Sequence, residues 1–298
     1  MRSFLAHHDL EGARGDRFLD GFPSETSDRD LESAANERPS KEVNMQSPRL
    51  AGKVALVTGG SRGIGKGIAR AFCEAGAQVM ITSRKADVCE QTAKELGDTV
   101  HWEAGHTARS DDAERVIGRT IERLGGLDIL VNNAATNPYA GPTIDVDRAR
   151  WEKTLDVNLS APLFWTQLAW QRSLKENGGC VVNISSVGGL ATSPILGVYD
   201  ITKAALIHLT KQLAAELGPK VRVNAIAPGL IKTDFARVLW EGDRGEQVAT
   251  AYPLGRLGEP ADVASAALFL ADDACSGWIT GQTMVLDGGG IIGFNRVG

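Results

Sequence analysis

The chain has 298 residues, of which 43% are hydrophobic and 23% charged, and its formal net charge is -5. This globular composition, with a slight acidic balance, excludes a protein that recognises nucleic acid or an anionic membrane surface through basic charge. The sequence has no apolar run of the roughly 18 residues that span a bilayer. Its four cysteines show no metal-ligand spacing, which favours a reduced, cytoplasmic protein.

Residues 1–46 differ in composition from the rest of the chain. They hold ten acidic and six basic residues and no sustained apolar pattern, which is typical of a disordered segment. They lack the apolar core of a secretory signal, and their acid content argues against a transit peptide. We predict a disordered leader over 1–46 that activity does not require, with Met45 as an alternative natural start, and a single domain over 47–298.

From Lys53 onward, short apolar runs alternate with amphipathic stretches. The apolar runs predict strands over residues 54–57, 78–81, 99–102, 128–131, 180–184, 221–226 and 284–286. The stretches between them predict helices over residues 63–75, 86–96, 111–124, 146–177, 198–217 and 261–270. Strands joined through helices pair in parallel by right-handed crossovers. The expected fold class is α/β, a doubly wound parallel sheet of about seven strands with a binding crevice outside the strands' carboxyl ends.

Three glycines, Gly59, Gly63 and Gly65, end the first strand and open the first helix. Glycine lacks the Cβ that would keep a pyrophosphate away from the backbone, and a helix amino terminus offers it free N–H groups. The spacing differs from the common GxGxxG fingerprint. The strand–turn–helix context nevertheless favours dinucleotide binding over a purely structural turn.

The end of the second strand bears on the choice of cofactor. An NAD(H) site usually places Asp or Glu there to bind the ribose 2′-hydroxyl, whereas residues 81–85 read ITSRK, without a carboxylate. Arg84, and Arg62 in the glycine loop, are suited to a 2′-phosphate, because a guanidinium binds phosphate in a bidentate way. We predict NADP(H), with NAD(H) as the alternative. The structural alternative is that both arginines are solvated surface charges.

Tyr199 and Lys203 are four residues apart at the start of a predicted helix, which places them on one face. A phenol is a poor acid or base at neutral pH, and a nearby ammonium favours the phenolate. We therefore expect Lys203 to lower the pKa of Tyr199. Alone, this pair is weak evidence, but the glycine loop and Ser185-Ser186 precede it in the chain.

Together these motifs resemble the short-chain dehydrogenase/reductase family, with a pattern similar to its 3-oxoacyl-carrier-protein reductases. The resemblance extends from about Lys53 to Gly289, and it implies a Rossmann-like domain. It rests on residues 58–65, Asn132-Asn133-Ala134-Ala135, Asp156-Val157-Asn158-Leu159, Ser186 thirteen residues before Tyr199, Pro228-Gly229-Leu230-Ile231-Lys232-Thr233, and Asp287-Gly288-Gly289.

The resemblance implies roles for four catalytic residues. Tyr199 would exchange a proton with the substrate oxygen, and Ser186 would hydrogen-bond that oxygen. Lys203 would lower the pKa of Tyr199 and hold the nicotinamide ribose. Asn158, through its backbone and a water, would connect Lys203 to solvent as a proton relay.

The resemblance also implies a cofactor site. Its expected residues are Gly59, Ser61, Arg62, Gly63, Ile64, Gly65, Ser83, Arg84, Asn132, Ala134, Tyr199, Lys203, Pro228, Gly229, Ile231 and Thr233. One position departs from the family pattern. After the third strand, where the family usually has an Asp that contacts the adenine, this chain has Gly105-His106. Backbone groups or His106 would then hold the adenine, although His106 also suits an exposed loop.

The substrate is expected to be a small carbonyl compound or secondary alcohol, a ketone or a 3-oxoacyl thioester among them. Residues 230–259 carry spaced large side chains, Phe235 and Trp240 among them, which predict a mobile amphipathic lid over an apolar pocket or a subunit contact. The family resemblance implies a homotetramer. The alternatives are an NAD(H)-dependent alcohol or sugar dehydrogenase of the same family, and a non-catalytic dinucleotide-sensing protein.

Overall fold

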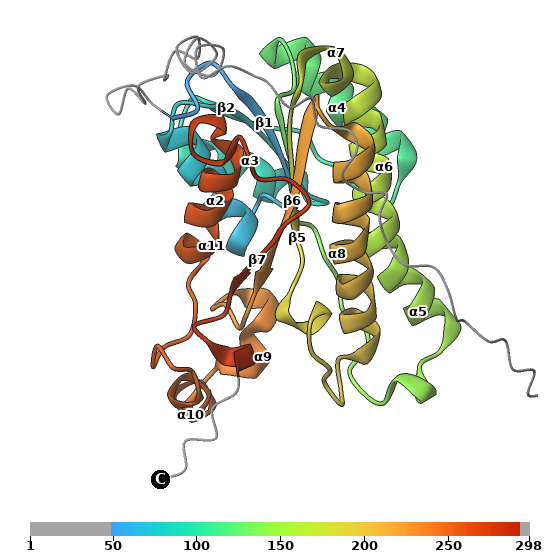
Figure 1. Ribbon diagram of the computed structural model, residues 1–298, viewed down its shortest axis with the longest axis vertical. Coiled ribbons are helices and arrows are strands. Elements are labelled where there is room, and N and C mark those ends of the chain that lie inside the picture. The colour runs from blue at the N-terminus through green and yellow to red at the C-terminus, as the bar shows by residue number, and fades with distance from the viewer. Residues whose placement is uncertain (1–48, 293–298) are drawn as a thin grey trace, which may run out of the picture. The chain divides into compact units, whose positions relative to one another are not determined.

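Seven strands form one parallel sheet in the order β3-β2-β1-β4-β5-β6-β7 in a computed structural model that describes residues 49–292 (Figure 1). The strands are β1 Val54–Thr58, β2 Gln78–Thr82, β3 Val100–Trp102, β4 Ile129–Asn132, β5 Gly179–Ile184, β6 Val221–Pro228 and β7 Thr283–Leu286. The predicted fold class and the seven predicted strands are confirmed. The predicted leader over 1–46 lies outside the described residues.

Helices cover both faces of this sheet, which is why its central strands are apolar on both sides. On one face α2 (Gly63–Glu74), α3 (Ala86–Leu96) and α11 (Pro260–Ala271) pack over a cluster that includes Phe72 and Val263. On the other face α4 (Ser110–Leu124), α6 (Ala161–Ala169) and α8 (Gly197–Leu217) pack around Trp165 and Leu130 (Figure 1).

The order of the strands reverses at β1, which pairs with β2 on one side and with β4 on the other. At such a switch point the two neighbouring connections leave the sheet in opposite directions and open a crevice at the carboxyl ends of the strands. The glycine loop follows β1 directly, so the predicted cofactor motif lies at the expected place.

The helix predicted over residues 146–177 is interrupted twice. It consists of α5 (Arg148–Leu155), a π-helical turn (Asp156–Ser160), α6, a second π turn (Trp170–Leu174) and α7 (Lys175–Asn177). Pro162 lies just after the first π turn and has no N–H, so the α-helical donor to the carbonyl of Asn158, four residues earlier, is absent.

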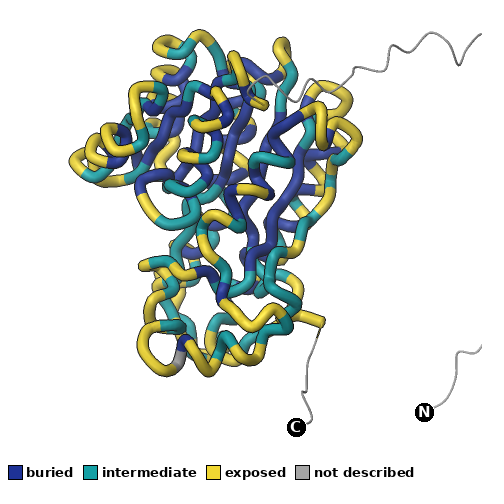
Figure 2. Tube along the Cα trace, turned by 90° about the vertical axis from the view of Figure 1, so that its left-hand side faces the viewer, coloured by how far each residue is buried: buried dark blue, intermediate teal, exposed yellow. Residues whose placement is uncertain are grey.

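The sequence prediction missed three short helices: α9 (Arg237–Trp240), α10 (Asp243–Ala251) and α12 (Asp273–Ser276). The first two lie in the segment predicted as a lid. Figure 2 shows buried residues concentrated in the sheet, whereas the lid segment is mostly half-buried or exposed. Within residues 49–292, no helix combines the length and the apolar character needed to cross a membrane.

Candidate active site

The glycine loop joins β1 to α2 with two residues in the left-handed region, Gly59 at φ 63° and Gly63 at φ 52°. A Cβ on Gly65 would lie 2.3 Å from the carbonyl oxygen of Gly59, so only glycine allows this close turn. The first turn of α2 has no acidic residue and no side-chain cap. Its N–H groups are therefore available to an anion, and the loop fits a dinucleotide phosphate. Ile64 packs on the core from this turn.

Two residues at the ends of β1 and β4 fix the glycine loop. The hydroxyl of Thr58 accepts from the N–H groups of Asn133 and Ala134, at 3.0 and 3.1 Å. The side-chain amide of Asn133 donates to the carbonyls of Thr58 and Gly59, at 2.8 and 3.2 Å. Sequence reasoning missed this role of Asn133, which only the pairing of β1 with β4 reveals.

Asn132, predicted as a cofactor residue, turns its side chain into the sheet. Its amide donates to Asn183 at 2.9 Å and to Thr166 at 3.2 Å, and Asn183 donates in turn to Thr210 at 2.9 Å. Asn132 is 4% exposed. This ladder of polar side chains ties β4 and β5 to α6 and α8. Ala134, by contrast, lies against Gly59 of the loop.

The end of β2 carries the predicted phosphate-binding residues. Arg84 is exposed, as is Arg62 in the glycine loop, and neither forms an ion pair with any residue in the range 49–292. The hydroxyl of Thr82 is buried without a hydrogen-bond partner in the described chain. The exposed side chains here thus offer two guanidinium groups, which fit an adenosine ribose carrying a phosphate.

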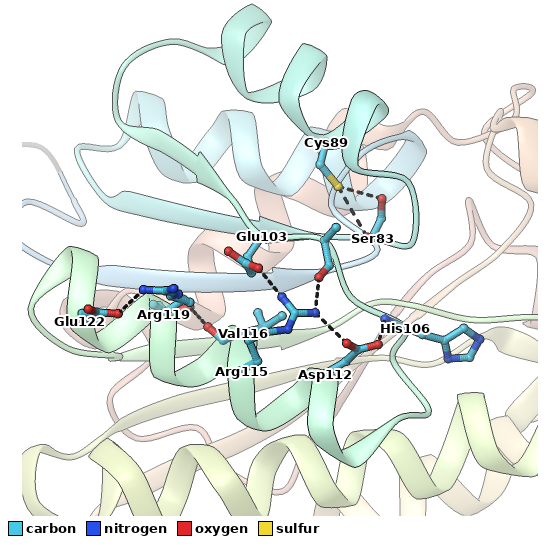
Figure 3. A network of polar contacts seen from close by, with 11 residues as sticks. Ser83, Cys89, Glu103, His106, Asp112, Arg115, Val116, Arg119 and Glu122 are labelled. Carbon is cyan, nitrogen blue, oxygen red and sulfur yellow. Dashed lines mark hydrogen bonds and ion pairs between the residues drawn. The ribbon is translucent and has the colours of Figure 1, made fainter.

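A carboxylate of α4 holds the connection from β3 to α4, where the family usually has an aspartate. The N–H of His106 donates to Asp112 at 2.9 Å, and Arg115 donates to Asp112 at 2.6 Å (Figure 3). Arg115 also contacts Glu103 and donates to the carbonyl of Ala104 at 2.7 Å. The ring of His106 turns away from Asp112 and Arg115 in Figure 3 and accepts from the N–H of Ala108 in the same loop, at 3.2 Å.

The catalytic candidates meet where β5 ends and α8 begins. The side chain of Ser186 lies close enough to the Tyr199 phenol to lower its pKa, and its hydroxyl accepts from the N–H of Gly188 at 3.1 Å. Lys203 Nζ lies 5.4 Å from the centre of the Tyr199 ring. Ser185 instead donates to the carbonyl of Lys203 at 2.9 Å. The structure therefore brings together Ser186, Tyr199 and Lys203, and it gives Ser185 a structural contact.

The pKa values of this pair differ from the expectation. Burial raises the pKa of Tyr199 to about 12, although the neighbouring Ser186 side chain lowers it in part. Burial also lowers the pKa of Lys203 to about 7. Lys203 Nζ donates to the carbonyl of Ile184 at 2.8 Å rather than to the phenol. Because burial disfavours charge on both groups, Lys203 does not lower the pKa of Tyr199 in this geometry.

Asn158 lies in the π turn and is fully buried. Its side-chain oxygen accepts from the N–H of Thr136 at 2.8 Å, and its amide donates to the carbonyl of Thr136 at 2.9 Å. The amide also donates to Thr202 at 3.1 Å, and Thr202 donates to the carbonyl of Tyr199 at 2.7 Å. The side chain of Asn158 thus fastens the segment after β4 to the first turn of α8.

Asp200, which sequence reasoning did not single out, is a buried carboxylate beside Tyr199. It is 6% exposed and accepts from the N–H of Ser193 at 3.1 Å. Burial raises its pKa to about 6, and its charge contributes to raising the pKa of Tyr199. A Cβ on Gly188 would lie 2.0 Å from Asp200 Oδ1. Asp200 therefore holds the loop that carries Ser186 against the start of α8.

The loop after β6, whose Pro228, Gly229, Ile231 and Thr233 are predicted to bind the cofactor, approaches the glycine loop. Pro228 ends β6, and Gly229 continues it by donating to the carbonyl of Leu286 at 2.9 Å. Ile231 is buried and bridges to Gly258. A Cβ on Gly63 would lie 3.1 Å from the Thr233 methyl group. Thr233 therefore borders the glycine loop.

The lid segment places an aromatic side chain beside the catalytic phenol. The rings of Phe235 and Tyr199 are 6.4 Å apart between centroids, at an interplanar angle of 42°. Phe235 remains 51% exposed. Trp240 donates from its indole to the carbonyl of Thr233 at 3.0 Å, which ties α9 to the loop after β6. The apolar face next to Tyr199 is thus open to a substrate.

Comparisons with known proteins agree with this site. The model of the family described as Enoyl-(Acyl carrier protein) reductase matches residues 59–290. Dehydrogenase/reductase SDR family member 4 of Homo sapiens is 42% identical over 245 residues, which cover 80% of this chain and 88% of that protein. The protein of the same name in Caenorhabditis elegans is 38% identical over 250 residues, covering 81% and 96%.

A solved structure shares the fold as well as the sequence pattern. The short-chain type dehydrogenase/reductase from Mycobacterium ulcerans is 35% identical, with a TM-score of 0.77 over 82% of this chain and 91% of that chain. The predicted membership of the short-chain dehydrogenase/reductase family and the predicted fold are therefore confirmed. The chain belongs to the short-chain dehydrogenase/reductase family and is an oxidoreductase acting on CH–OH and carbonyl groups.

Proposed function

We propose that this oxidoreductase is NADP(H)-dependent and interconverts a carbonyl compound, such as a ketone or a 3-oxoacyl thioester, with its secondary alcohol. The observation that carries the proposal is the meeting of three side chains: Lys203 Nζ lies 5.4 Å from the centre of the Tyr199 ring, and Ser186 lies beside the same phenol. These groups lie at the carboxyl end of β5, beside the switch point of the sheet.

Each catalytic candidate has a role that its surroundings support. The nicotinamide, when bound, supplies or accepts the hydride. Tyr199, whose pKa is raised to about 12, keeps its proton at neutral pH and is suited to donate it to a carbonyl oxygen. Ser186 hydrogen-bonds the same oxygen. Lys203, with a pKa of about 7, exchanges a proton readily near neutral pH and can replace the one that Tyr199 loses.

Asn158 is proposed to assist Lys203 through its backbone. Because Pro162 has no N–H, the carbonyl of Asn158 lacks its α-helical donor and is available to a water. A water there would link Lys203 to solvent. The side chain of Asn158 is already committed to Thr136 and Thr202, so the relay would use its backbone carbonyl.

The preference for NADP(H) rests on charge. Arg62 and Arg84 are exposed on two neighbouring loops, and neither has an acidic partner within residues 49–292. The stretch after β2, Ser83-Arg84-Lys85, holds no carboxylate that would repel a 2′-phosphate. A 2′-phosphate therefore gains two bidentate partners, and a 2′-hydroxyl gains no acceptor.

Cofactor oxidation in the presence of a substrate panel tests the proposal. The purified protein is mixed with NADPH or NADH and with ketones, 3-oxoacyl thioesters, sugars and an enoyl thioester, while cofactor absorbance is followed. We expect turnover with carbonyl substrates and NADPH. Turnover with the enoyl thioester alone would replace the proposed reaction with reduction of a C=C bond. A protein that binds cofactor but oxidises it with no substrate would be the dinucleotide-sensing alternative.

The role of Tyr199 is tested by Tyr199→Phe, which keeps the ring and removes the proton donor. We expect turnover to fall about 1000-fold, the scale of a lost general acid. The dissociation constant for NADPH is expected to change by less than about twofold, since the ring is retained. Turnover above a few per cent of wild type would show that another group supplies the proton.

We also propose that the protein is a homotetramer assembled through its long helices and its last strand. Leu163 and Phe164 on α6 are 36% and 52% exposed, and Val285 on the edge strand β7 is 39% exposed. Trp278, just before β7, is fully exposed at 100%. Apolar groups of this size on an unpaired strand edge and a helix face are typical of subunit contacts.

A further inference from the structure

The buried face of α3 contacts both loops that carry the predicted phosphate-binding arginines. Thr92 donates from its hydroxyl to the carbonyl of Ser61 at 3.0 Å. Cys89, three residues earlier on the same face, lies with Sγ 3.0 Å from Ser83 Oγ and 3.7 Å from the Ser83 carbonyl oxygen (Figure 3). The two side chains are 3% and 0% exposed, so both contacts are shielded from water.

The two contacted serines directly precede the arginines. Ser61 is followed by Arg62 in the glycine loop, and Ser83 is followed by Arg84 at the end of β2. The loops are also joined directly, because the N–H of Gly60 donates to the carbonyl of Thr82 at 3.2 Å. Fixing the backbone at the two serines therefore fixes the points from which the two guanidinium groups extend.

We propose that Cys89 and Thr92 are positioning residues that set the separation of Arg62 and Arg84, and thereby determine the preference for NADP(H) over NAD(H). The proposal rests on the NADP(H) dependence argued above. Neither residue needs to touch the cofactor. The effect is selective, because only a 2′-phosphate engages both guanidinium groups at once, whereas the pyrophosphate binds the N–H groups of the glycine loop.

The thiol of Cys89 is suited to this role in its neutral form. Burial raises the pKa of this thiol, and it outweighs the two contacts with Ser83, which lower the pKa. Cys89 therefore keeps its proton at neutral pH and can donate to the oxygens of Ser83. Ser83 is held from its other side as well, since its carbonyl accepts from the N–H of Gly105 at 2.9 Å.

Substitutions at Thr92 isolate one contact. Thr92→Val removes the hydroxyl and keeps the shape, while Thr92→Ser keeps the hydroxyl. The matched control is Thr120→Val on α4, because Thr120 is equally buried and its hydroxyl bonds only the carbonyl of Val116 in its own helix. Dissociation constants for NADPH, NADH, 2′,5′-ADP and 5′-AMP are measured by calorimetry, and thermal unfolding follows stability.

We expect Thr92→Val to weaken binding of NADPH and 2′,5′-ADP about tenfold, the scale of one lost buried hydrogen bond. Binding of NADH and 5′-AMP to Thr92→Val is expected to change less than about twofold. Thr92→Ser and Thr120→Val are expected to bind all four ligands within about twofold of wild type. If Thr92 had a purely structural role, Thr92→Val would weaken the binding of all four ligands. Thr92→Val and Thr120→Val would then lower the unfolding temperature equally.

Cys89 is tested in the same way with Cys89→Ala and Cys89→Ser. The control is Cys180→Ala, which also removes a buried thiol but one that makes no side-chain hydrogen bond with residues 49–292. We expect Cys89→Ala to weaken binding of the ligands with a 2′-phosphate, NADPH and 2′,5′-ADP, selectively. Cys89→Ser is expected to recover part of this affinity, and the control is expected to show no selective loss. The proposal requires a selective loss of NADPH and 2′,5′-ADP binding in both Thr92→Val and Cys89→Ala.

The wild-type measurement separates this inference from the proposed function. A wild type that binds NADPH more tightly than NADH, with variants that keep the same ratio, overturns the role of Cys89 and Thr92 alone. A wild type without this preference overturns the proposed NADP(H) dependence and the inference together. The substrate assay with Tyr199→Phe remains independent of both results, because it reports on the proton donor.

Discussion

Two ionisable side chains, Asp200 and Lys203, are buried within two turns of α8, and Tyr199 beside them is half-buried. Burial disfavours charge on each, raising the pKa of the phenol and of the carboxyl and lowering that of the ammonium. Burying such groups costs stability that an apolar residue at the same position would not. We therefore expect these groups to serve the reaction or to hold the loop that carries Ser186. Their titration should be measurable in solution.

Asp200→Asn tests the cost of the buried carboxylate. The folded pKa of Asp200 is about 6, above its ordinary value of 3.8, so its charged form destabilises the fold above pH 6. We expect the variant to be more stable than wild type at pH 8 by roughly 1–3 kcal/mol. The difference shrinks as pH falls below 6 and disappears only below about pH 3, where the wild-type carboxyl is protonated in both the folded and the unfolded state.

Chemical denaturation at several pH values measures this difference, and the pH profile of turnover gives a second reading. Because the charge of Asp200 contributes to raising the pKa of Tyr199, the profile of the variant is expected to shift to lower pH. A stability difference that is the same at pH 4 and pH 8 would contradict the titration of Asp200.

The sequence predicted the residues whose spacing along the chain carries meaning. Tyr199 and Lys203 are one helical turn apart, and Ser186 precedes them at a fixed distance, so a linear pattern reveals them. Asn133, Asp200 and Cys89 act through contacts with residues of other elements, which no spacing displays. The pKa of Tyr199 was predicted in the wrong direction, because charge proximity can be read from a sequence whereas burial cannot.

At the scale of elements, the seven strands and the main helices were predictable from apolar periodicity. The predicted helix over residues 146–177 contains two π turns that periodicity cannot show, because a π turn changes the register by a fraction of a turn. Short helices α9 and α10 were missed, since helices of four and nine residues with large exposed side chains resemble a loop. Both deviations lie beside the site.

Pro162→Ala tests the link between the π turn and the proposed relay. The substitution supplies the missing N–H, so the helix through Asn158 is expected to adopt regular geometry and the protein to gain roughly 1–3 kcal/mol of stability. Turnover is expected to fall about tenfold, because the carbonyl of Asn158 becomes occupied and its side chain shifts from Thr136.

Thermal unfolding and steady-state kinetics measure the two effects of Pro162→Ala separately. Ala161→Gly, at the neighbouring buried position on the same turn, is the control for a general disturbance of α6. A variant that gains stability without losing turnover would show that the π turn has no part in the reaction.

At the scale of the whole molecule, the described fold begins at its anchor to α2 and α11. Leu50 is 1% exposed and donates to the carbonyl of Ala75 at 2.8 Å, and Arg49 pairs with Asp272 at 2.7 Å. Residues before this anchor are expected to be dispensable. A chain starting at Met45 should match the full chain in turnover within about twofold.

A second truncation provides the contrast. A chain starting at Gly52 loses Arg49 and Leu50, and it is expected to unfold at a lower temperature because a buried leucine contributes about 2 kcal/mol. If the chain starting at Met45 loses turnover, the leader has a role beyond that of a disordered segment.

The proposed tetramer is tested at the edge of the sheet. Val285→Lys on β7 places a charge on the exposed apolar edge, and we expect light scattering to show smaller species than for wild type. Ile144→Lys is the control, since Ile144 is 92% exposed but lies away from β7 and α6. A monomeric wild type at micromolar concentration would contradict the proposal.

The single hydroxyl of Thr58, which accepts from two successive amides after β4, has a kinetic consequence. Because the glycine loop is already fixed to the neighbouring strand, a dinucleotide does not have to order it on arrival. Encounter with either nicotinamide dinucleotide should then be equally fast. Discrimination by the extra phosphate would lie in residence time, so that the two ligands differ in how long they stay.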